Sequence, residues 1–510
     1  MVKLIKSITK SIGYGVKNDP EIDRLKKKHP KFFNFIKKRL TKNHKYGRHL
    51  TVGILVTLVF VYFFYGIVRS YIGQESLVQF DLRVINLFSL LRHPKLNQQM
   101  LFITYLAKGE IIVAGLLVFS IILFLHKRWR LLFTLLISVG VGEIFVWIIK
   151  NTIDRPRPSL VNALVAESSY SLPSGHTFVA IAFYGLLVYF VIQSNRNKFL
   201  KIISFIFGIC LITLVGLSRI YLGAHWPSDV FAGVAFGSAW LSILITSFRI
   251  KKKFNPPKKI QINLKPKTLL ISSILLVTIW VVYIFYFFYT HPLIEKQIIT
   301  IPKKTIDISQ ITTQLFKNLP KISESISSVP SEPINIIVVS DQKTLDKAFV
   351  NSGWYLLDEP SLSSYTQIVT SIILKKPYPQ TPGLPVFWDT FPCPFSYGQP
   401  THPSSISSRH HIHFWDTNYI TPEGQTIWVG TAHFDEKIKK KFKIILPFHT
   451  TQLIVDEERE NIKNTLEKNG FLSSFEKINL TGLLYGTKKS GNNFLTDGQA
   501  YILYLKDETR

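Results

Sequence analysis

Cysteine and acidic residues are both scarce in this 510-residue sequence. It has two cysteines, Cys210 inside an apolar run and Cys393 far from it, which excludes a disulfide framework and a cysteine-based metal motif. The 32 acidic residues stand against 61 lysines and arginines, so the formal net charge is +29. Charged residues make up only 18% of the chain and hydrophobic residues 47%, which excludes an ordinary soluble protein. The composition therefore predicts a membrane protein.

The excess of positive charge has two explanations. A basic chain can bind nucleic acid, but here the lysines and arginines flank apolar runs, as they do in membrane proteins. We therefore expect no nucleic-acid partner. Residues 1–49 hold fifteen basic and three acidic residues, and apolar and basic residues alternate within 30–40. This segment is either an interfacial helix on anionic lipid or a solvated basic tail, two interpretations that the sequence leaves open.

Seven apolar runs are long enough to cross most of a hydrocarbon core of about 30 Å. The second is the least regular, because Lys108 and Glu110 interrupt its start. We expect no cleavable signal peptide, since the first run begins near Leu50 and is long enough to stay in the membrane. Residues 80–92 suggest a short amphipathic helix at the outer surface. The expected limits of the spans are 50–72, 105–125, 131–149, 177–193, 200–217, 230–248 and 268–289.

The orientation of these spans follows from the charge of the loops. If the spans alternate, the N-terminal segment and the loops after the second, fourth and sixth spans share one side, and all four are basic. Basic loops mark the cytoplasmic side. We therefore predict a multi-pass protein of the cytoplasmic (inner) membrane with a cytoplasmic N-terminus. The ends of the third and fifth spans and the starts of the fourth and sixth then share the extracytoplasmic face.

The residues that suggest chemistry lie at these extracytoplasmic ends. Lys150, Arg157 and Arg219 provide three cations. A phosphoryl group in transfer spreads negative charge over its oxygens, so positioned cations and backbone N–H groups stabilise it. A guanidinium group binds two such oxygens at once, whereas lysine acts as a point charge. Ser174 and Gly175 stand where the fourth span begins, and a helix N-terminus attracts an anion. We expect these five residues to bind a phosphate group.

Two histidines and one carboxylate complete the set. His225 is the better candidate nucleophile, because Asp229, one helical turn further on, can accept its other ring N–H and fix the tautomer. His176 remains as the general acid for the leaving group, a role suited to a side chain that titrates near neutral pH. These stretches hold no carboxylate cluster for a magnesium pair, so we expect metal-independent turnover without a cofactor. The loop 159–172 is expected to shape substrate access.

The eleven residues of the pattern K-x6-RP, PSGH and SR-x5-H-x3-D all match one family signature. Residues 50–248 thus resemble the type 2 phosphatidic acid phosphatase superfamily, which includes membrane lipid phosphatases, undecaprenyl pyrophosphate phosphatases, glucose-6-phosphatase and soluble vanadium haloperoxidases. The resemblance implies that His225 forms a phosphohistidine, that Asp229 supports it and that His176 protonates the leaving group. The phosphate-binding residues that it implies are Lys150, Arg157, Ser174, Gly175 and Arg219.

After the seventh span the composition becomes polar, and residues 290–510 are predicted to form a soluble outer domain. Around 409–415, 428–435 and 456–459 the sequence resembles the LssY-type C-terminal domain, which follows such phosphatase cores elsewhere. That resemblance implies no function. Strands are predicted at 334–339, 411–415, 426–431, 442–446 and 500–505, and helices at 342–351 and 456–469.

Histidines in this outer domain raise the question of a metal site. His411 and His413 lie on one face of a predicted strand, and His433 and His449 are elsewhere in the domain, a pattern that permits a zinc site. Such spacing arises freely in sheets that contain histidine. Ordinary sheet-face histidines are therefore the favoured interpretation, and no metal site is predicted.

The complete prediction is an all-α transmembrane bundle followed by a soluble α+β domain, divided into a basic segment (1–49), a membrane phosphatase domain (50–289) and an outer domain (290–510). Its predicted function is hydrolysis of a lipid phosphomonoester or pyrophosphate at the outer leaflet. A polyprenyl pyrophosphate such as undecaprenyl pyrophosphate is favoured, because the basic cluster suits a pyrophosphate, and phosphatidate is second.

Two alternative functions remain open. One is a phosphotransferase that passes the phosphoryl group to a sugar or lipid acceptor. The other is an envelope-binding protein whose outer domain carries the main role. The expected partners are the bilayer, a membrane lipid phosphate and an unidentified envelope component bound by the outer domain.

Overall fold

The computed structural model describes two compact units, each with its own hydrophobic core. The first consists of the described parts of 1–69, 97–157 and 167–293, and the second of those of 70–96, 158–166 and 294–510. The described residues are 19–40, 47–74, 76–158, 163–165, 167–194, 197–254, 266–292, 302–359, 361–374, 376–383, 385–402, 408–441, 444–487 and 493–506.

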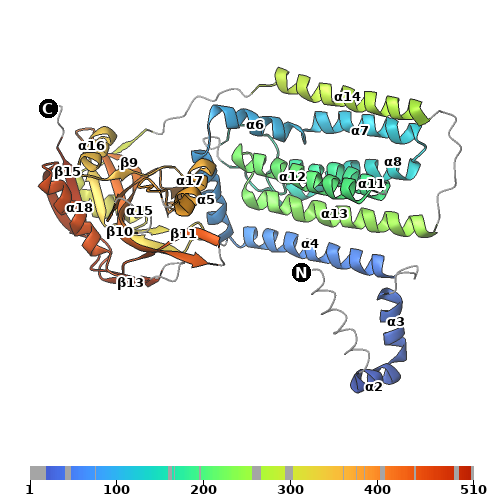
Figure 1. Ribbon diagram of the computed structural model, residues 1–510, viewed down its shortest axis with the longest axis horizontal. Helices are drawn as coiled ribbons and strands as arrows, with labels where there is room; N and C mark the ends of the chain where they lie inside the picture. The colour runs from blue at the N-terminus through green and yellow to red at the C-terminus, as the bar shows by residue number, and fades with distance from the viewer. Residues whose placement is uncertain are drawn as a thin grey trace. The chain divides into compact units, whose positions relative to one another are not determined.

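Apolar helices make up most of the first unit (Figure 1). In the described part of the chain, six are long and apolar enough to cross a membrane. A seventh span results if α6 (Pro94–Tyr105) and α7 (Gly109–Leu125), which meet at 44°, are counted together. The predicted helical transmembrane core is therefore confirmed. The six are α4 (Arg48–Ile72), α8–η1–α9 (Trp129–Leu136, Ile137–Val141, Gly142–Ile153), α10–η2–α11 (Gly175–Ala180, Ile181–Gly185, Leu186–Ser194), α12 (Lys198–Tyr221), α13 (Pro227–Phe254) and α14 (Pro266–Thr290).

Two shorter helices precede these spans. They are α2 (Pro20–Lys28) and α3 (Pro30–Leu40), and α3 covers the stretch in which apolar and basic residues alternate. Its helical form agrees with either interpretation of the N-terminal segment.

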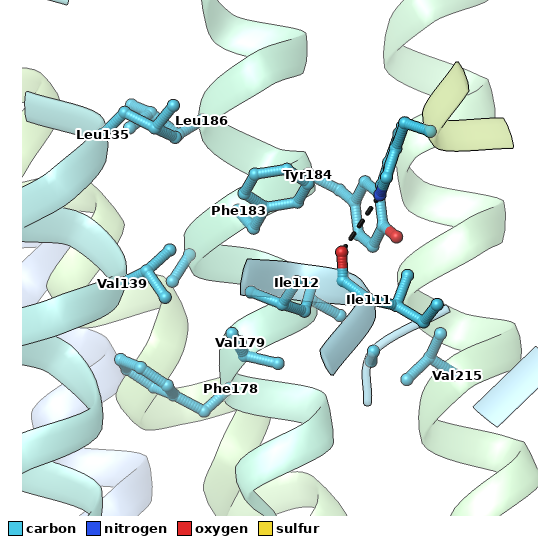
Figure 2. Packing of buried hydrophobic residues seen from close by; sticks show 14 of the residues in the cluster. Ile111, Ile112, Leu135, Val139, Phe178, Val179, Phe183, Tyr184, Leu186 and Val215 are labelled. Atoms are coloured by element: carbon cyan, nitrogen blue, oxygen red, sulfur yellow. Dashed lines mark hydrogen bonds between the residues drawn. The ribbon is translucent and has the colours of Figure 1, made fainter. Parts of the chain in front are cut away.

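The core of the first unit gathers around the helix that starts at Gly175. Figure 2 shows Phe178, Phe183 and Tyr184 of this helix among aliphatic side chains from neighbouring helices, with one hydrogen bond drawn as a dashed line. Trp280 of α14 donates that bond from its indole nitrogen to the carbonyl of Ile111 at 3.0 Å. The bond satisfies a polar group that the core would otherwise leave without a partner.

Local signals end and start the helices that border the candidate site. Asp154 caps α9 in the left-handed conformation, with φ of 45°, and Pro156 and Pro158 prevent the helix from continuing. Ser174 is the N-cap of α10, and its side chain accepts a bond from the amide of Thr177. These signals bring the chain out of one helix and into the next at the same end of the bundle.

Helix α5 (Ser76–Leu90) groups with the second unit. It is the helix predicted at 80–92. Its buried face packs against β7 (Phe391–Pro392), and Arg83, 3% exposed, donates a hydrogen bond to Glu324. Its polar residues thus have partners in the strand-rich unit, which explains the amphipathic pattern.

A nine-stranded sheet forms the centre of the second unit within its described residues, in the order β12-β15-β4-β10-β9-β8-β5, with β1 paired to β9 and β11 to β10. The β15–β4 and β1–β9 pairs are parallel and the others antiparallel. The strands are β1 (Lys304–Thr305), β4 (Ile336–Val339), β5 (Tyr355–Leu356), β8 (Phe395–Pro400), β9 (Arg409–Ile420), β10 (Thr426–Lys441), β11 (Ile444–Thr451), β12 (Leu472–Asn479) and β15 (Gln499–Leu505).

Two smaller sheets and several helices complete this unit. Together with the large sheet they confirm the predicted α+β domain, and α16 covers the residues predicted as helix 342–351. Of the predicted strand 442–446, residues 442–443 lie outside the described residues. The remaining elements are β2 (Ile322–Glu324), β3 (Pro330–Pro333), β6 (Phe387–Trp388) and β7 in one sheet, β13 (Leu484–Thr487) and β14 (Asn493–Thr496) in another, and the helices η3 (Ile308–Gln310), η4 (Ile311–Leu315), α15 (Phe316–Asn318), α16 (Gln342–Asn351), α17 (Leu362–Leu374) and α18 (Asp456–Lys468).

Side chains alternate between the two faces of the large sheet. On β9, Ile412 and Phe414 belong to the cluster that includes Leu345 of α16 and Ile462 of α18. Trp415 belongs to the cluster on the opposite face. The odd-numbered residues of β9, among them His411 and His413, therefore face away from α16 and α18.

Candidate active site

Three helix ends converge because small residues let the helices approach closely. A Cβ at Gly233 of α13 would lie 2.8 Å from the carbonyl oxygen of Ser174, and one at Gly216 of α12 would lie 2.9 Å from Val230. Glycine is therefore required at both positions for this packing. The start of α10, the end of α12 and the start of α13 consequently lie together, and they carry six of the eight residues that the sequence predicted.

His225 and Asp229 form the centre of this arrangement. Both are buried, and His225 Nδ1 lies 3.4 Å from Asp229 Oδ2. The same carboxylate oxygen accepts hydrogen bonds from the amide of Trp226 at 2.9 Å and from the hydroxyl of Ser171. Asp229 thus accepts bonds from groups on three sides, which fixes its position beside the imidazole.

Arg155 is a residue of this site that the sequence analysis missed. Its Nη1 donates to Asp229 Oδ1 and to the hydroxyl of Ser228, both at 2.7 Å. A buried carboxylate requires a partner of opposite charge. A cation that pairs with Asp229 could therefore have been expected. The family pattern gave no signal, because Arg155 occupies one of its unspecified positions between Lys150 and Arg157.

The second ring nitrogen of His225 faces the cations. Arg157 Nη1 lies 3.2 Å from His225 Nε2 and donates to the carbonyl of Ala224 at 2.6 Å. Burial, followed by the charges of Arg219, Arg157 and Lys150, holds the pKa of His225 well below its ordinary value. The imidazole is therefore neutral at physiological pH. With Nδ1–H directed at Asp229, Nε2 carries a lone pair toward the cations.

Lys150 and Arg157 both hold the chain segment that precedes Ser171. Lys150 Nζ donates to the carbonyl of Tyr170 at 2.5 Å and to the hydroxyl of Ser169 at 3.2 Å. Arg157 donates from Nε to the carbonyl of Ser169 at 2.5 Å and from Nη2 to its hydroxyl at 3.0 Å. The two cations therefore converge on oxygens of Ser169 and Tyr170.

Arg219 pairs with Glu167, a residue that the sequence assigned only to a loop shaping access. Arg219 Nη2 donates to Glu167 Oε1 at 2.5 Å, and Nη1 donates to the hydroxyl of Thr104 at 2.9 Å. Its Nε is buried without a hydrogen-bond partner among the described residues. Burial alone would raise the pKa of Glu167, but the charge and hydrogen bond of Arg219 outweigh it and lower that pKa. Glu167 is thus an ionised carboxylate paired with Arg219.

The start of α10 contributes the remaining predicted residues. The amide of Ser174 donates to the carbonyl of Asp229 at 3.0 Å, so this amide links α10 to the Asp229 turn. Gly175 and His176 occupy the first helical turn, where amides have no partner within the helix. The His176 side chain interacts electrostatically with the three cations Arg219, Arg157 and Lys150. All eight predicted residues therefore lie in one site.

Two parts of the chain match known protein families. A family model described as PAP2 superfamily matches residues 127–253, and one described as LssY C-terminus matches 316–500. Phosphatidylglycerophosphatase B of Bacillus subtilis is 31% identical over 198 residues, which are 38% of this chain and 96% of that protein. Undecaprenyl-diphosphatase of Sulfolobus acidocaldarius is 28% identical over 213 residues, 41% of this chain and 96% of that protein. The crystal structure of a transmembrane PAP2 type phosphatidylglycerolphosphate phosphatase from Bacillus subtilis covers 40% of this chain and 99% of its own, with 26% identity and a TM-score of 0.36.

Proposed function

Because this chain belongs to the PAP2 superfamily and is a phosphatase, we propose that it hydrolyses a membrane lipid phosphate through a phosphohistidine on His225, without a metal ion. The observation that carries the proposal is the His225–Asp229 pair. It directs a neutral Nε2 at a group of three cations, Lys150, Arg157 and Arg219. A nucleophile and a phosphate-binding group thus lie side by side.

The reaction proceeds in two steps. In the first, the Nε2 lone pair of His225 attacks phosphorus and the bond to the leaving oxygen breaks. His176 gives that oxygen a proton, and Asp229 holds Nδ1–H and stabilises the charge on the imidazole. In the second, water attacks the phosphohistidine while His176 takes its proton, and inorganic phosphate leaves. The three cations stabilise the charge on the transferring group in both steps.

The substrate class follows from the membrane unit and from the names of the relatives. One relative is a phosphatidylglycerophosphatase and the other an undecaprenyl-diphosphatase. Both names indicate a lipid that ends in a phosphoryl group, and the three cations suit a diphosphate in particular. We propose an isoprenoid diphosphate as the preferred substrate and a glycerophospholipid monoester as the second.

Phosphate release by the detergent-purified full chain tests this proposal. Undecaprenyl diphosphate, phosphatidylglycerophosphate and phosphatidate are supplied separately in excess chelator, with His225→Ala as the inactive variant and His126→Ala, outside the site, as the matched control. We expect release by the wild type and the control only. Release by His225→Ala, or release that requires added magnesium, contradicts the mechanism. A phosphorylated acceptor in place of free phosphate identifies a phosphotransferase.

We also propose that the site faces the outside of the cytoplasmic membrane. Ser168, exposed near the site, and Arg128, exposed in the α7–α8 turn, provide a matched pair for labelling. Each is replaced by cysteine in a chain that carries Cys210→Ser and Cys393→Ser. A membrane-impermeant thiol reagent applied to intact cells should label Ser168→Cys and not Arg128→Cys. The reverse pattern overturns the orientation.

A further inference from the structure

Three buried histidines meet on one face of the large sheet. His411 and His413 lie two residues apart on β9, and His433 of β10 stands directly opposite His411 in the strand register. Their exposed fractions are 2%, 4% and 5%. One ring nitrogen from each lies within 4.8 Å of the other two. Each imidazole carries polar atoms that burial removes from water, so these atoms need partners inside the protein.

We propose that His411, His413 and His433, with the carboxylate of Asp435 beside them, bind one divalent transition-metal ion of the zinc class. The first support is a set of unsatisfied nitrogens. His411 Nε2 and His413 Nδ1 are buried and have no hydrogen-bond partner within the described ranges. Buried polar atoms are normally paired, and a lone pair on an imidazole nitrogen is a strong metal ligand.

The second support is the position of Asp435 between two of the rings. Its Oδ1 lies 3.3 Å from His433 Nε2, which is long for a charge-assisted hydrogen bond. This carboxylate oxygen therefore lies beside the nitrogen of His433 that would face an ion.

The third support is the set of groups behind the ligands. His411 Nδ1 lies 3.3 Å from Asp435 Oδ2, and His433 Nδ1 lies 2.8 Å from Glu332 Oε2. A carboxylate on the far nitrogen fixes the ring orientation of a metal-bound histidine and makes it a better ligand. Arg409 Nε donates to Asp435 Oδ2 at 3.2 Å and holds that carboxylate in place. The Nε2 atoms of His411 and His433 are thereby the atoms available to the ion.

The chemistry of the ligand atoms and the loop that covers them indicate a structural ion of the zinc class. Imidazole nitrogens with one carboxylate suit zinc, whereas magnesium and calcium prefer oxygen ligands. A Cβ at Gly383 would lie 3.0 Å from His411 Cε1 and 3.6 Å from His413 Cε1, so the backbone of this loop covers both rings. Through Glu332 on β3, the ion would also tie the smaller sheet to the large one. The fourth histidine named in the sequence, His449, has a side chain outside the described residues.

Metal content and cobalt spectroscopy of the full chain test the proposal. The purified protein is stripped with a chelator and titrated with Co²⁺, whose visible absorption reports tetrahedral nitrogen and oxygen ligation, and bound zinc is counted by mass spectrometry before stripping. We expect about one ion per chain. His413→Gln, which keeps the side-chain volume, should weaken binding at least tenfold. The matched control is His410→Gln, since His410 lies on the same strand and pairs with Glu458 of α18 instead.

A second measurement compares the thermal unfolding midpoint of each protein with and without zinc. Because the comparison is made within one protein, a variant that is less stable overall does not affect it. Zinc added to stripped wild-type protein should raise the unfolding midpoint, and zinc added to His413→Gln should not. Equal metal content in His413→Gln and His410→Gln, or no tetrahedral cobalt spectrum from the wild type, overturns the proposal. Neither measurement uses phosphate release. Failure of the metal proposal can therefore be distinguished from failure of the proposed phosphatase mechanism.

Discussion

Arg155 and Asp229 form an ion pair that is almost completely removed from solvent. Arg155 Nη1 lies 2.7 Å from Asp229 Oδ1, and the side chains are 2% and 0% exposed. Asp229 also lies beside His225, so the same carboxylate serves a structural partner with one oxygen and the proposed nucleophile with the other. Because the two roles share one side chain, replacing Asp229 should affect folding and chemistry together.

A double-mutant cycle should separate these two roles. Arg155→Met leaves Asp229 buried without its cation, which should lower the free energy of unfolding by about 3–5 kcal/mol. Asp229→Asn leaves Arg155 uncompensated in the same way and should also lower kcat by a factor on the order of 10²–10⁴. The double variant should recover much of the stability and none of the rate. Thermal unfolding and phosphate release of all four proteins check this, and strictly additive stability losses would refute the coupling.

The eight residues proposed for the site could be named from the sequence, because their types and spacing suit phosphoryl transfer and the predicted topology puts them on one membrane face. The sequence could not predict the role of Arg155. A third basic residue between Lys150 and Arg157 does not reveal from the sequence which carboxylate it pairs with. The pairing of Glu167 with Arg219 could not be predicted either, because the two residues are 52 positions apart in the sequence. For His411, His413 and His433, the sequence showed the shared face on one strand. It did not show the strand register that puts His433 opposite His411.

Glu167 should compete with the substrate for Arg219. Its carboxylate occupies Arg219 Nη2 at 2.5 Å, a donor that phosphate would use. Glu167→Gln removes the competing charge, so the KM for the lipid phosphate and the inhibition constant for inorganic phosphate should each fall on the order of tenfold. Glu110→Gln, an exposed carboxylate of the same unit, should change neither. A KM that rises in Glu167→Gln would show that Glu167 positions Arg219 instead.

The close approach of α10 and α13 should be sensitive to one methyl group. A Cβ at Gly233 would lie 2.8 Å from the carbonyl oxygen of Ser174 and 3.0 Å from Thr177, so Gly233→Ala must push the helices apart. We expect a loss of about 1–3 kcal/mol in the free energy of unfolding and a reduced kcat, since Ser174 also contacts Asp229. Gly66→Ala is the matched control in α4, where a Cβ would meet no atom within 4 Å. Equal thermal midpoints for the two variants would contradict the packing argument.

The pH dependence of the reaction should show that the cations around His225 lower its pKa. This residue must be neutral to attack phosphorus, and its pKa lies well below the ordinary 6.5 because of burial and of Arg219, Arg157 and Lys150. The neutral form therefore persists as the pH falls past 6.5, and the acid limb of kcat/KM, which reports the free enzyme, should lie below that value. Arg157→Gln removes one of the charges that disfavour protonation.

In Arg157→Gln the acid limb should consequently shift to higher pH, in addition to a lower rate at every pH. The substrate phosphate titrates in the same range, but it does so equally for both proteins, so the difference between the two profiles isolates the enzyme. Profiles of kcat/KM for wild type and Arg157→Gln, measured with one lipid phosphate, check the prediction. An unchanged limb would mean that the group titrating in the free enzyme lies away from Arg157, and His225 would then lose its place as the nucleophile.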